Sequence, residues 1–292
     1  MVHNLRSRNC LKSGCLYLFM FLGVLASGCR ERYREDLDYS YSVAQTWTID
    51  ELPNIEFVQF ESVFWEPDDT VSLRKLISED GIVAGCDVLE IGTGTGLISI
   101  LCLENSARSV VATDINRAAA ANAEYNAAMI CPDQTLDVRT VTADDPGAFS
   151  VIEANEKFDL VISNPPWEDG AVNKPADHAF YDPGFQLMDS LLAGLQSHLK
   201  PSGRCLLAYG NVQAIKRLIA ESEKRGFHIK ILDDRKLDTL ADDFLPGMLL
   251  ELRPEVPMIK TGTDEVAPVG KKENADADST DSTESGTAGS DT

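Results

Sequence analysis

The 292-residue chain has few basic residues for its acidic content. It holds 26 Lys and Arg against 47 Asp and Glu, a formal net charge of −21 at pH 7. Long nucleic acids are bound chiefly through Lys and Arg contacts to phosphates, and beyond the N-terminal segment the sequence has no basic run. The basic group formed by Lys216, Arg217, Lys224 and Arg225 fits the solvated face of a helix. The composition therefore disfavours, without excluding, a DNA or RNA partner.

The sequence also lacks the groupings that several enzyme classes need. It shows no Ser/His/Asp set, no paired carboxylates and no cluster with metal-ligand spacing, so hydrolase and metalloenzyme interpretations have no support. Its cysteines have neither metal nor redox spacing, and we expect those in the central region to be small buried apolar residues. Thiols without an evident pairing favour a reducing compartment. These central cysteines are Cys86, Cys102, Cys131 and Cys205.

The N-terminus has the pattern of an export signal. Arg6, Arg8 and Lys12 precede an apolar run at 16–26, and small residues then lead to Cys29. This order is typical of a secretory signal peptide, and it resembles a bacterial lipobox in which Cys29 would be lipidated and would attach the protein to a membrane. The run is shorter than the about twenty residues of a transmembrane helix. The alternatives are an uncleaved anchor, or a mis-assigned start codon before a cytoplasmic protein.

The rest of the chain divides into three parts by composition. Residues 30–60 form a linker or an N-terminal extension, and residues 61–255 carry alternating strand and helix patterns. This alternation predicts an α/β fold with a doubly wound, mostly parallel sheet and a final antiparallel strand. Residues 256–292 are acidic and nearly free of large apolar side chains, so we expect a disordered tail. The expected strands are 87–91, 109–113, 136–141, 158–163, 204–209, 228–232 and 247–252, and the expected helices are 97–104, 117–129, 185–199 and 212–225.

The most informative motif follows the strand at 158–163 and reads Asn164–Pro165–Pro166–Trp167. Proline has no N–H and a fixed φ, so the strand must end there in a rigid extended segment. The Asn164 amide oxygen and the Pro165 carbonyl then become outward acceptors beside the indole of Trp167. Two acceptors and a flat surface suit a planar NH2 group, either a carboxamide or the exocyclic amine of a base.

A glycine loop follows the strand at 87–91. Gly92, Gly94 and Gly96 allow a tight turn and a close approach of the backbone to a ligand. Leu97 occupies the place where the dinucleotide fingerprint has its third glycine, so the spacing departs from the NAD pattern. Asp114, at the end of the next strand, has the separation at which an acid binds a ribose diol.

Together these motifs resemble those of the class I S-adenosylmethionine-dependent methyltransferases. Within that class the chain is similar to the small-domain group that methylates planar nitrogens, which includes adenine-N6 and glutamine-N5 enzymes with an Asn/Asp-Pro-Pro-aromatic motif. The resemblance spans about residues 60 to 253. It implies a seven-stranded Rossmann-like sheet, S-adenosylmethionine as cofactor and an acceptor with a planar NH2 group.

The resemblance also implies residue roles in donor binding. Glu90, Gly92, Gly94 and Gly96 would surround the methionine end, and Asp114 would bind the ribose hydroxyls. Ile115 would pack on the adenine. Asp144 would accept from the adenine amino group, with Asp145 as a close competitor. The catalytic group would be Asn164, Pro165 and Trp167.

Two further features have competing interpretations. Pro67-x-x-Thr70 resembles a segment of the glutamine-N5 enzymes, but it lacks their arginine after the proline, and residues 30–60 are too few for their helical substrate domain. His178 lies in the loop after the Pro-Pro motif, where we expect a solvated side chain rather than a substrate contact.

The function remains open among three possibilities. A protein carboxamide or a small-molecule amide or amine is favoured, and adenine N6 of DNA or RNA is the alternative. A non-catalytic membrane-anchored lipoprotein that has kept the fold is the rival, because S-adenosylmethionine is made in the cytosol and an export signal would separate the domain from it. The sequence gives no indication of oligomeric state.

Overall fold

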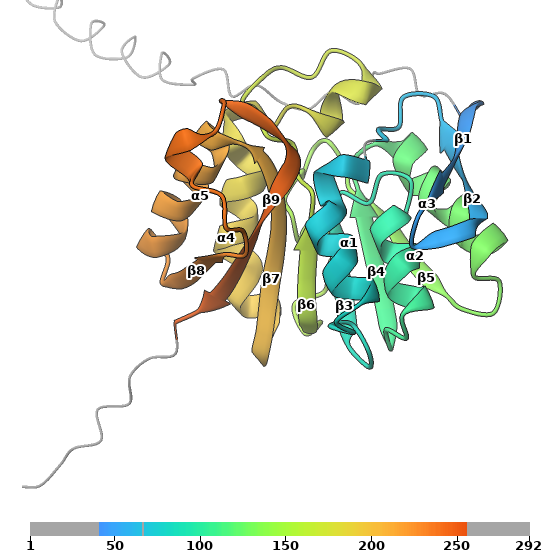
Figure 1. Ribbon diagram of the computed structural model, residues 1–292, viewed down its shortest axis with the longest axis horizontal. Coiled ribbons are helices and arrows are strands. Elements are labelled where there is room, and N and C mark those ends of the chain that lie inside the picture. The colour runs from blue at the N-terminus through green and yellow to red at the C-terminus, as the bar shows by residue number, and fades with distance from the viewer. Residues whose placement is uncertain (1–40, 66, 256–292) are drawn as a thin grey trace, which may run out of the picture. The chain divides into compact units, whose positions relative to one another are not determined.

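A seven-stranded sheet runs through the part of the chain that the computed structural model describes, residues 41–65 and 67–255 (Figure 1). Its strand order is β5-β4-β3-β6-β7-β9-β8. The pairs from β5 to β7 are parallel, and β9 is antiparallel to both of its neighbours, which confirms the expected final strand. The strands are β3 (Asp87–Ile91), β4 (Ser109–Asp114), β5 (Leu136–Thr140), β6 (Phe158–Ser163), β7 (Leu199–Asn211), β8 (Phe227–Ile231) and β9 (Asp243–Pro254).

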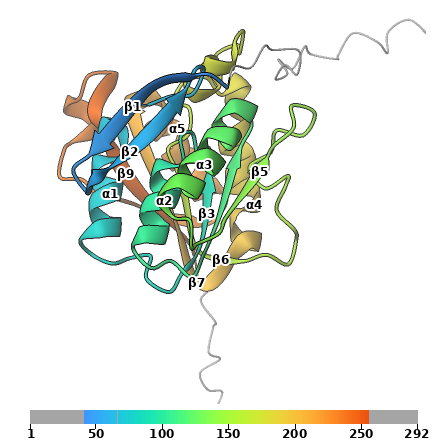
Figure 2. The same ribbon diagram turned by 90° about the vertical axis from the view of Figure 1, so that its right-hand side faces the viewer.

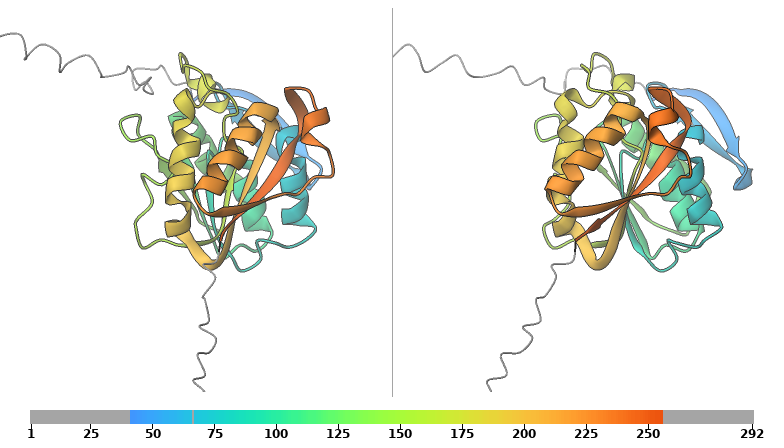
Figure 3. Two further views of the ribbon diagram at one scale, coloured as in Figure 1. Left: turned by 90° about the vertical axis from the view of Figure 1, so that its left-hand side faces the viewer. Right: turned by 60° about the vertical axis from the view of Figure 1, so that its left-hand side comes forward.

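Helices cover both faces of this sheet, as the two views of Figure 3 show. Because successive side chains of a strand point to opposite faces, β6 gives Val161 to one core cluster and Leu160 and Ile162 to the other. The first cluster includes α4 (Gln186–His198) and α5 (Val212–Lys224). The second includes α1 (Val71–Ser78), α2 (Leu97–Glu104) and the end of α3 (Arg117–Ile130). The predicted doubly wound α/β fold is therefore confirmed.

A β-hairpin precedes the sheet where the sequence suggested a linker or an extension. It consists of β1 (Val43–Ile49) and β2 (Leu52–Phe60), and it lies beside α3 (Figure 2). Asn126 and Asn122 of α3 accept from the backbone N–H groups of Val58 and Phe60, at 2.9 and 2.8 Å. These side chains replace strand partners for β2 and fix the hairpin to the domain.

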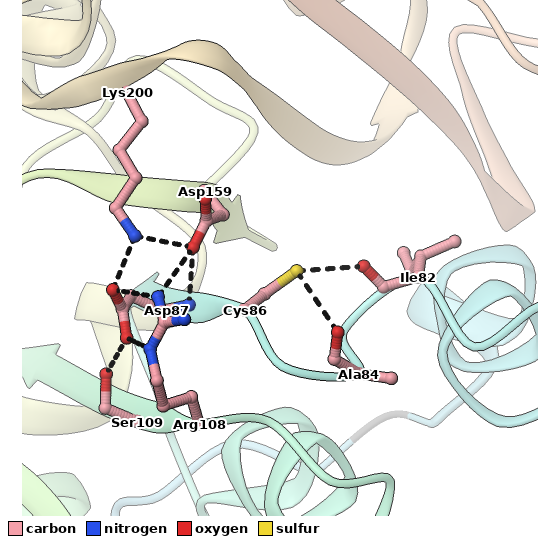
Figure 4. Close-up of polar contacts among 8 residues, drawn as sticks. All are labelled: Ile82, Ala84, Cys86, Asp87, Arg108, Ser109, Asp159 and Lys200. Carbon is pink, nitrogen blue, oxygen red and sulfur yellow. Dashed lines mark hydrogen bonds and ion pairs between the residues drawn. The ribbon is translucent and has the colours of Figure 1, made fainter.

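An ion-pair network joins the amino ends of the parallel strands, and Figure 4 draws its side chains. Lys200 of β7 contacts Asp87 of β3 at 2.5 Å and Asp159 of β6 at 2.7 Å, and the Arg108 Nε donates to Asp87 at 2.7 Å. The bonds from Arg108, and then those from Lys200 and Ser109, hold the pKa of Asp87 well below its usual value against the effect of burial. The network lies at the opposite ends of the strands from the loops described below, so its role is to hold the sheet together.

The remaining predictions about the termini lie outside the described residues. The signal segment with Cys29 falls within residues 1–40, and the acidic tail falls within residues 256–292. Both stay predictions, as do the domain bounds. None of the helices in residues 41–65 and 67–255 is long and apolar enough to cross a membrane.

Candidate methyl-donor and acceptor site

The glycine loop folds back on the end of β4. The N–H groups of Gly92 and Thr93 donate to the Thr113 carbonyl at 2.8 and 3.0 Å. Gly92 and Gly96 have φ of +78° and +84°, in the left-handed region that side chains with a Cβ avoid. A Cβ on Gly96 would also lie 3.0 Å from the Cα of Ala123. The loop conformation therefore depends on glycine, and at Gly96 the packing against α3 does too.

Glu90 is buried at the end of β3 and binds the loop internally. Its Oε2 accepts from the Thr93 hydroxyl at 2.8 Å, from the Ser99 N–H at 3.0 Å and from the Ser99 hydroxyl. Burial raises the pKa of Glu90 to about 7, and the Ser99 and Thr93 hydrogen bonds oppose that rise. Glu90 thus holds the glycine loop to the first turn of α2 and lines the cavity described next.

Asp114 ends β4 directly beside the loop. Its Oδ2 accepts from the Gly94 N–H at 2.9 Å, and its Oδ1 accepts from the Asn116 N–H at 2.8 Å. Burial raises the pKa of Asp114 to about 6, while these backbone bonds act in the opposite direction. Carboxylate oxygens have about four lone-pair sites in total, so Asp114 can still accept from a ligand.

A cavity at this edge of the sheet, here called the donor cavity, brings together most of the predicted donor-binding residues. Six of the predicted site residues line it: Glu90, Gly92, Gly94, Asp114, Ile115 and Asn164. Gly96 is not among its lining residues, since it packs against Ala123 instead. Asp144 is exposed and does not line it either, and neither does Asp145; the wall there is formed by Pro146, Gly147 and Ala148.

Asn164 stands where the donor cavity adjoins a second cavity, because it lines both. Its Nδ2 donates to the Oδ2 of Asp69 at 3.2 Å. Its Oδ1 is buried, and within residues 41–65 and 67–255 it has no hydrogen-bond partner. A buried carbonyl oxygen without a partner is costly, and a ligand N–H would satisfy it.

The second cavity, here called the acceptor cavity, is also lined by Pro165 and Trp167. The indole N–H of Trp167 donates to the Ala208 carbonyl at 3.3 Å. A Cβ on Gly210 would lie 2.4 Å from the Cη2 of this indole. The hydrogen bond and the close packing hold the ring in place at the cavity wall.

The acceptor cavity is acidic and aromatic. No Lys, Arg or His is among its lining residues. Two of the lining residues, Phe180 and Leu245, are 47% and 52% exposed. The acidic members are Asp69, Glu168 and Asp243, and the aromatic members are Phe64, Trp167, Phe180 and Phe244.

Some residues of the site were not foreseen from the sequence. His178 is buried at 8% exposure and lines the donor cavity, so the expectation of a solvated histidine was wrong. Burial lowers its pKa to about 4 against the opposing influence of Asp177, so the imidazole is neutral at pH 7. His178 is buried because it lies in the short helix Pro175–Ala179. The sequence shows no hydrophobic periodicity that would predict this helix. Asp69 was also missed, since its partner Asn164 lies far away in the sequence.

The donor cavity suits S-adenosylmethionine by its own chemistry. It offers a carboxylate for a ribose diol at Asp114, an apolar surface at Ile115 and open space over Gly92, where an added Cβ would meet nothing within 4 Å. The sheet order and the antiparallel β9 define the class I S-adenosylmethionine-dependent methyltransferase fold.

Comparison with known proteins gives the family. Residues 71–225, more than half of the chain, match the methyltransferase small domain, and the chain belongs to that family. S-adenosylmethionine is the cofactor of this methyltransferase.

Individual relatives are named for more specific activities than the family. A protein of Methanocaldococcus jannaschii named as an N5-glutamine methyltransferase is 29% identical over 187 residues, covering 62% of this chain and 89% of the relative. A release factor glutamine methyltransferase of Cereibacter sphaeroides is 35% identical over 138 residues, covering 43% and 47%. A T. thermophilus 16S rRNA N2 methyltransferase, solved with AdoMet and guanosine, has a TM-score of 0.52 at 16% identity, covering 73% of this chain and 51% of that one.

Proposed function

We propose that this methyltransferase transfers the methyl group to a planar nitrogen, and that the nitrogen belongs to a carboxamide of a protein. The observation that carries the proposal is the Asn164 Oδ1, which is buried, has no partner within residues 41–65 and 67–255, and adjoins both cavities. An acceptor NH2 in the acceptor cavity would satisfy this oxygen. A carboxamide or amine of a small molecule would meet the same requirement.

The chemistry follows from the nature of the acceptor. When bound, S-adenosylmethionine supplies an electrophilic methyl group on a sulfonium. A carboxamide nitrogen is a poor nucleophile because its lone pair is delocalised. The Asn164 Oδ1 and the Pro165 carbonyl would accept its two hydrogens, favour a localised lone pair and stabilise the developing positive charge. The Trp167 ring would hold the plane of the amide, so that the nitrogen faces the methyl group. The sulfonium becomes a neutral thioether, and the methylated nitrogen, which is strongly acidic while it carries the positive charge, loses its extra proton to water, so no strong general base is needed.

We also propose roles in donor binding for the residues at the donor cavity. Asp114 would accept from the ribose hydroxyls, Ile115 would pack on the adenine, and Glu90, Gly92 and Gly94 would border the methionine part. Gly96 would contribute by letting the loop pack on α3. The exposure of Asp144 weakens its proposed contact to the adenine, and the wall formed by residues 146–148 replaces it in this proposal.

The charge of the acceptor cavity supports a protein amide over a nucleic acid. Asp69, Glu168 and Asp243 would repel phosphates, and no basic side chain among the lining residues would neutralise them. The names of the M. jannaschii and C. sphaeroides relatives also favour glutamine N5. Adenine N6 of DNA or RNA remains the alternative.

The full-length protein tests both parts of the proposal. Calorimetry with S-adenosylhomocysteine is expected to show binding, and its absence at near-millimolar ligand would favour the non-catalytic lipoprotein. Methyl transfer from labelled S-adenosylmethionine is then measured on a bacterial release factor, a glutamine peptide, the same peptide with glutamate, and an adenine-containing oligonucleotide. Label in the first two alone is expected. Label in the oligonucleotide alone would instead establish the adenine alternative.

A further inference from the structure

Asp69 is a buried acid in the short helix Pro67–Thr70, at 6% exposure, and it lines the acceptor cavity. The helix lies directly on β9. A Cβ on Gly247 would come within 2.3 Å of the Asp69 carbonyl oxygen, so only glycine allows this approach. The backbone of the helix is therefore fixed against the sheet.

A second set of contacts, made to the Pro67 carbonyl, holds the first residue of the same helix. The Arg74 guanidinium donates to the Pro67 carbonyl at 3.1 Å and pairs with Glu51 in the turn of the hairpin. The Thr70 hydroxyl donates to the same carbonyl at 3.4 Å. The hairpin, α1 and β9 thus jointly determine where the Asp69 carboxylate lies.

The contact between Asp69 and Asn164 decides which end of the Asn164 amide faces the substrate. The two ends of an amide are distinguished by their hydrogen-bond partners. The Asn164 amide turns its NH2 to Asp69, with an Nδ2–Oδ2 distance of 3.2 Å, and the carboxylate oxygen accepts this hydrogen bond. The Oδ1 must then point away from Asp69, and within residues 41–65 and 67–255 it meets no hydrogen-bond partner.

We propose that Asp69 is a positioning residue that fixes the orientation of the Asn164 amide, and that it thereby makes the site select an acceptor that presents N–H. The proposal rests on the proposed function, in which Asn164 contacts the acceptor. With a neutral amide at position 69, either end of Asn164 can face the cavity. In the reversed orientation Asn164 presents NH2, binds an acceptor carbonyl and turns the acceptor nitrogen away from the donor. Such binding is unproductive, so turnover falls while binding persists.

The test compares Asp69→Asn with Asp68→Asn, which removes the same charge from an exposed neighbouring position. The first readout needs no acceptor. In protein labelled with 15N-asparagine, the side-chain NH2 signal of Asn164 is assigned by its loss in Asn164→Ala. Asp69→Asn is expected to shift this signal upfield and Asp68→Asn to leave it in place. An Asn164 signal that does not respond to Asp69→Asn overturns the proposal whatever the acceptor is.

The second readout is turnover on the acceptor labelled most strongly by the wild type. Asp69→Asn is expected to lower kcat at least about tenfold. This loss is smaller than the roughly 10²–10³-fold loss in kcat that is typical when such a stabiliser is removed altogether. KM and the affinity for S-adenosylhomocysteine are expected to stay within about twofold, and Asp69→Glu, which keeps an acceptor-only group, to retain more turnover than Asp69→Asn. Wild-type kcat in Asp69→Asn with an inactive Asn164→Ala overturns the role of Asp69 alone. An active Asn164→Ala overturns the proposed function instead.

Discussion

The Asp114 carboxylate accepts a hydrogen bond from the Gly94 N–H at 2.9 Å, which ties the end of β4 to the loop that follows β3. The two strands are parallel neighbours, with Ile91 opposite Thr113. The acid and the glycine loop are therefore held as one unit, and the proposed ribose-binding group is in place before a ligand binds. The burial that comes with this arrangement raises the pKa of Asp114 to about 6.

The first prediction concerns donor affinity at Asp114. Hydrogen bonds to a charged group contribute on the order of 1.5–3 kcal/mol each. Asp114→Ala is therefore expected to lower the affinity for S-adenosylhomocysteine at least about tenfold. Wild-type affinity is also expected to fall as the pH drops through about 6, because binding favours the ionised carboxylate and protonation removes an acceptor. Calorimetry between pH 5 and 8 measures both effects.

Asp144→Ala is the matched control, since Asp144 is an exposed acid outside the donor cavity. Its affinity for S-adenosylhomocysteine is expected to stay at the wild-type value. Loss of affinity in Asp144→Ala with none in Asp114→Ala would show that the ribose assignment is wrong and that Asp144 reaches the ligand after all.

The second prediction separates backbone strain from packing in the glycine loop. Alanine at Gly92 or Gly96 must adopt a positive φ, which costs roughly 1–2 kcal/mol. A Cβ at Gly92 meets nothing within 4 Å, whereas one at Gly96 lies 3.0 Å from Ala123. Gly96→Ala is therefore expected to lower the urea midpoint of unfolding more than Gly92→Ala. Equal midpoints would mean that α3 moves aside without cost.

The sheet could be predicted from sequence because its central strands β3, β4 and β6 are almost entirely buried and therefore read as apolar runs. The strand at 158–163 and the helix at 97–104 have the predicted bounds, since the Pro-Pro pair ends the strand and the glycine loop directly precedes the helix. The hairpin was missed because its first strand is mostly exposed and lacks a continuous apolar pattern. Asn122 and Asn126, which bond the hairpin to α3, are remote from it in sequence.

The candidate site also contains residues that local sequence patterns predict and residues that they do not. Gly92 and Gly94 come just after β3 and Asp114 ends β4, so their position at the sheet edge could be deduced from local patterns. Asp69 could not, because its place depends on the close approach to Gly247 and on Asn164, 95 residues further on. Contacts over such separations leave no periodic trace in a single sequence.

The third prediction concerns the N-terminal segment, which lies outside the described residues. If Cys29 is lipidated, the protein is expected to fractionate with membranes, and Cys29→Ser to leave a heavier, unprocessed form. Fractionation and intact mass measure this. A soluble product that begins downstream of Cys29 would favour a mis-assigned start codon. That result would also remove the conflict between an exported domain and a cytosolic methyl donor.

The last prediction concerns the Asn-Pro-Pro-Trp motif. Asn164→Ala is expected to lower the rate of methyl transfer about 10²–10³-fold, the usual loss for such an electrostatic stabiliser, with donor affinity nearly unchanged. Wild-type turnover in this variant would reduce the motif to a strand terminator.

Trp167 provides a contrast at the other side of the acceptor cavity. Its indole packs on Gly210 and donates to Ala208, so Trp167→Ala is expected to reduce stability as well as acceptor binding. Trp167→Phe is the sharper variant, because it keeps an aromatic face while it loses the N–H and one ring of the indole. It is expected to preserve KM for the acceptor far better than alanine, as measured by steady-state kinetics. Equal KM values in the two variants would mean that the ring does not contact the acceptor, and that Trp167 serves only to pack the loop onto β7.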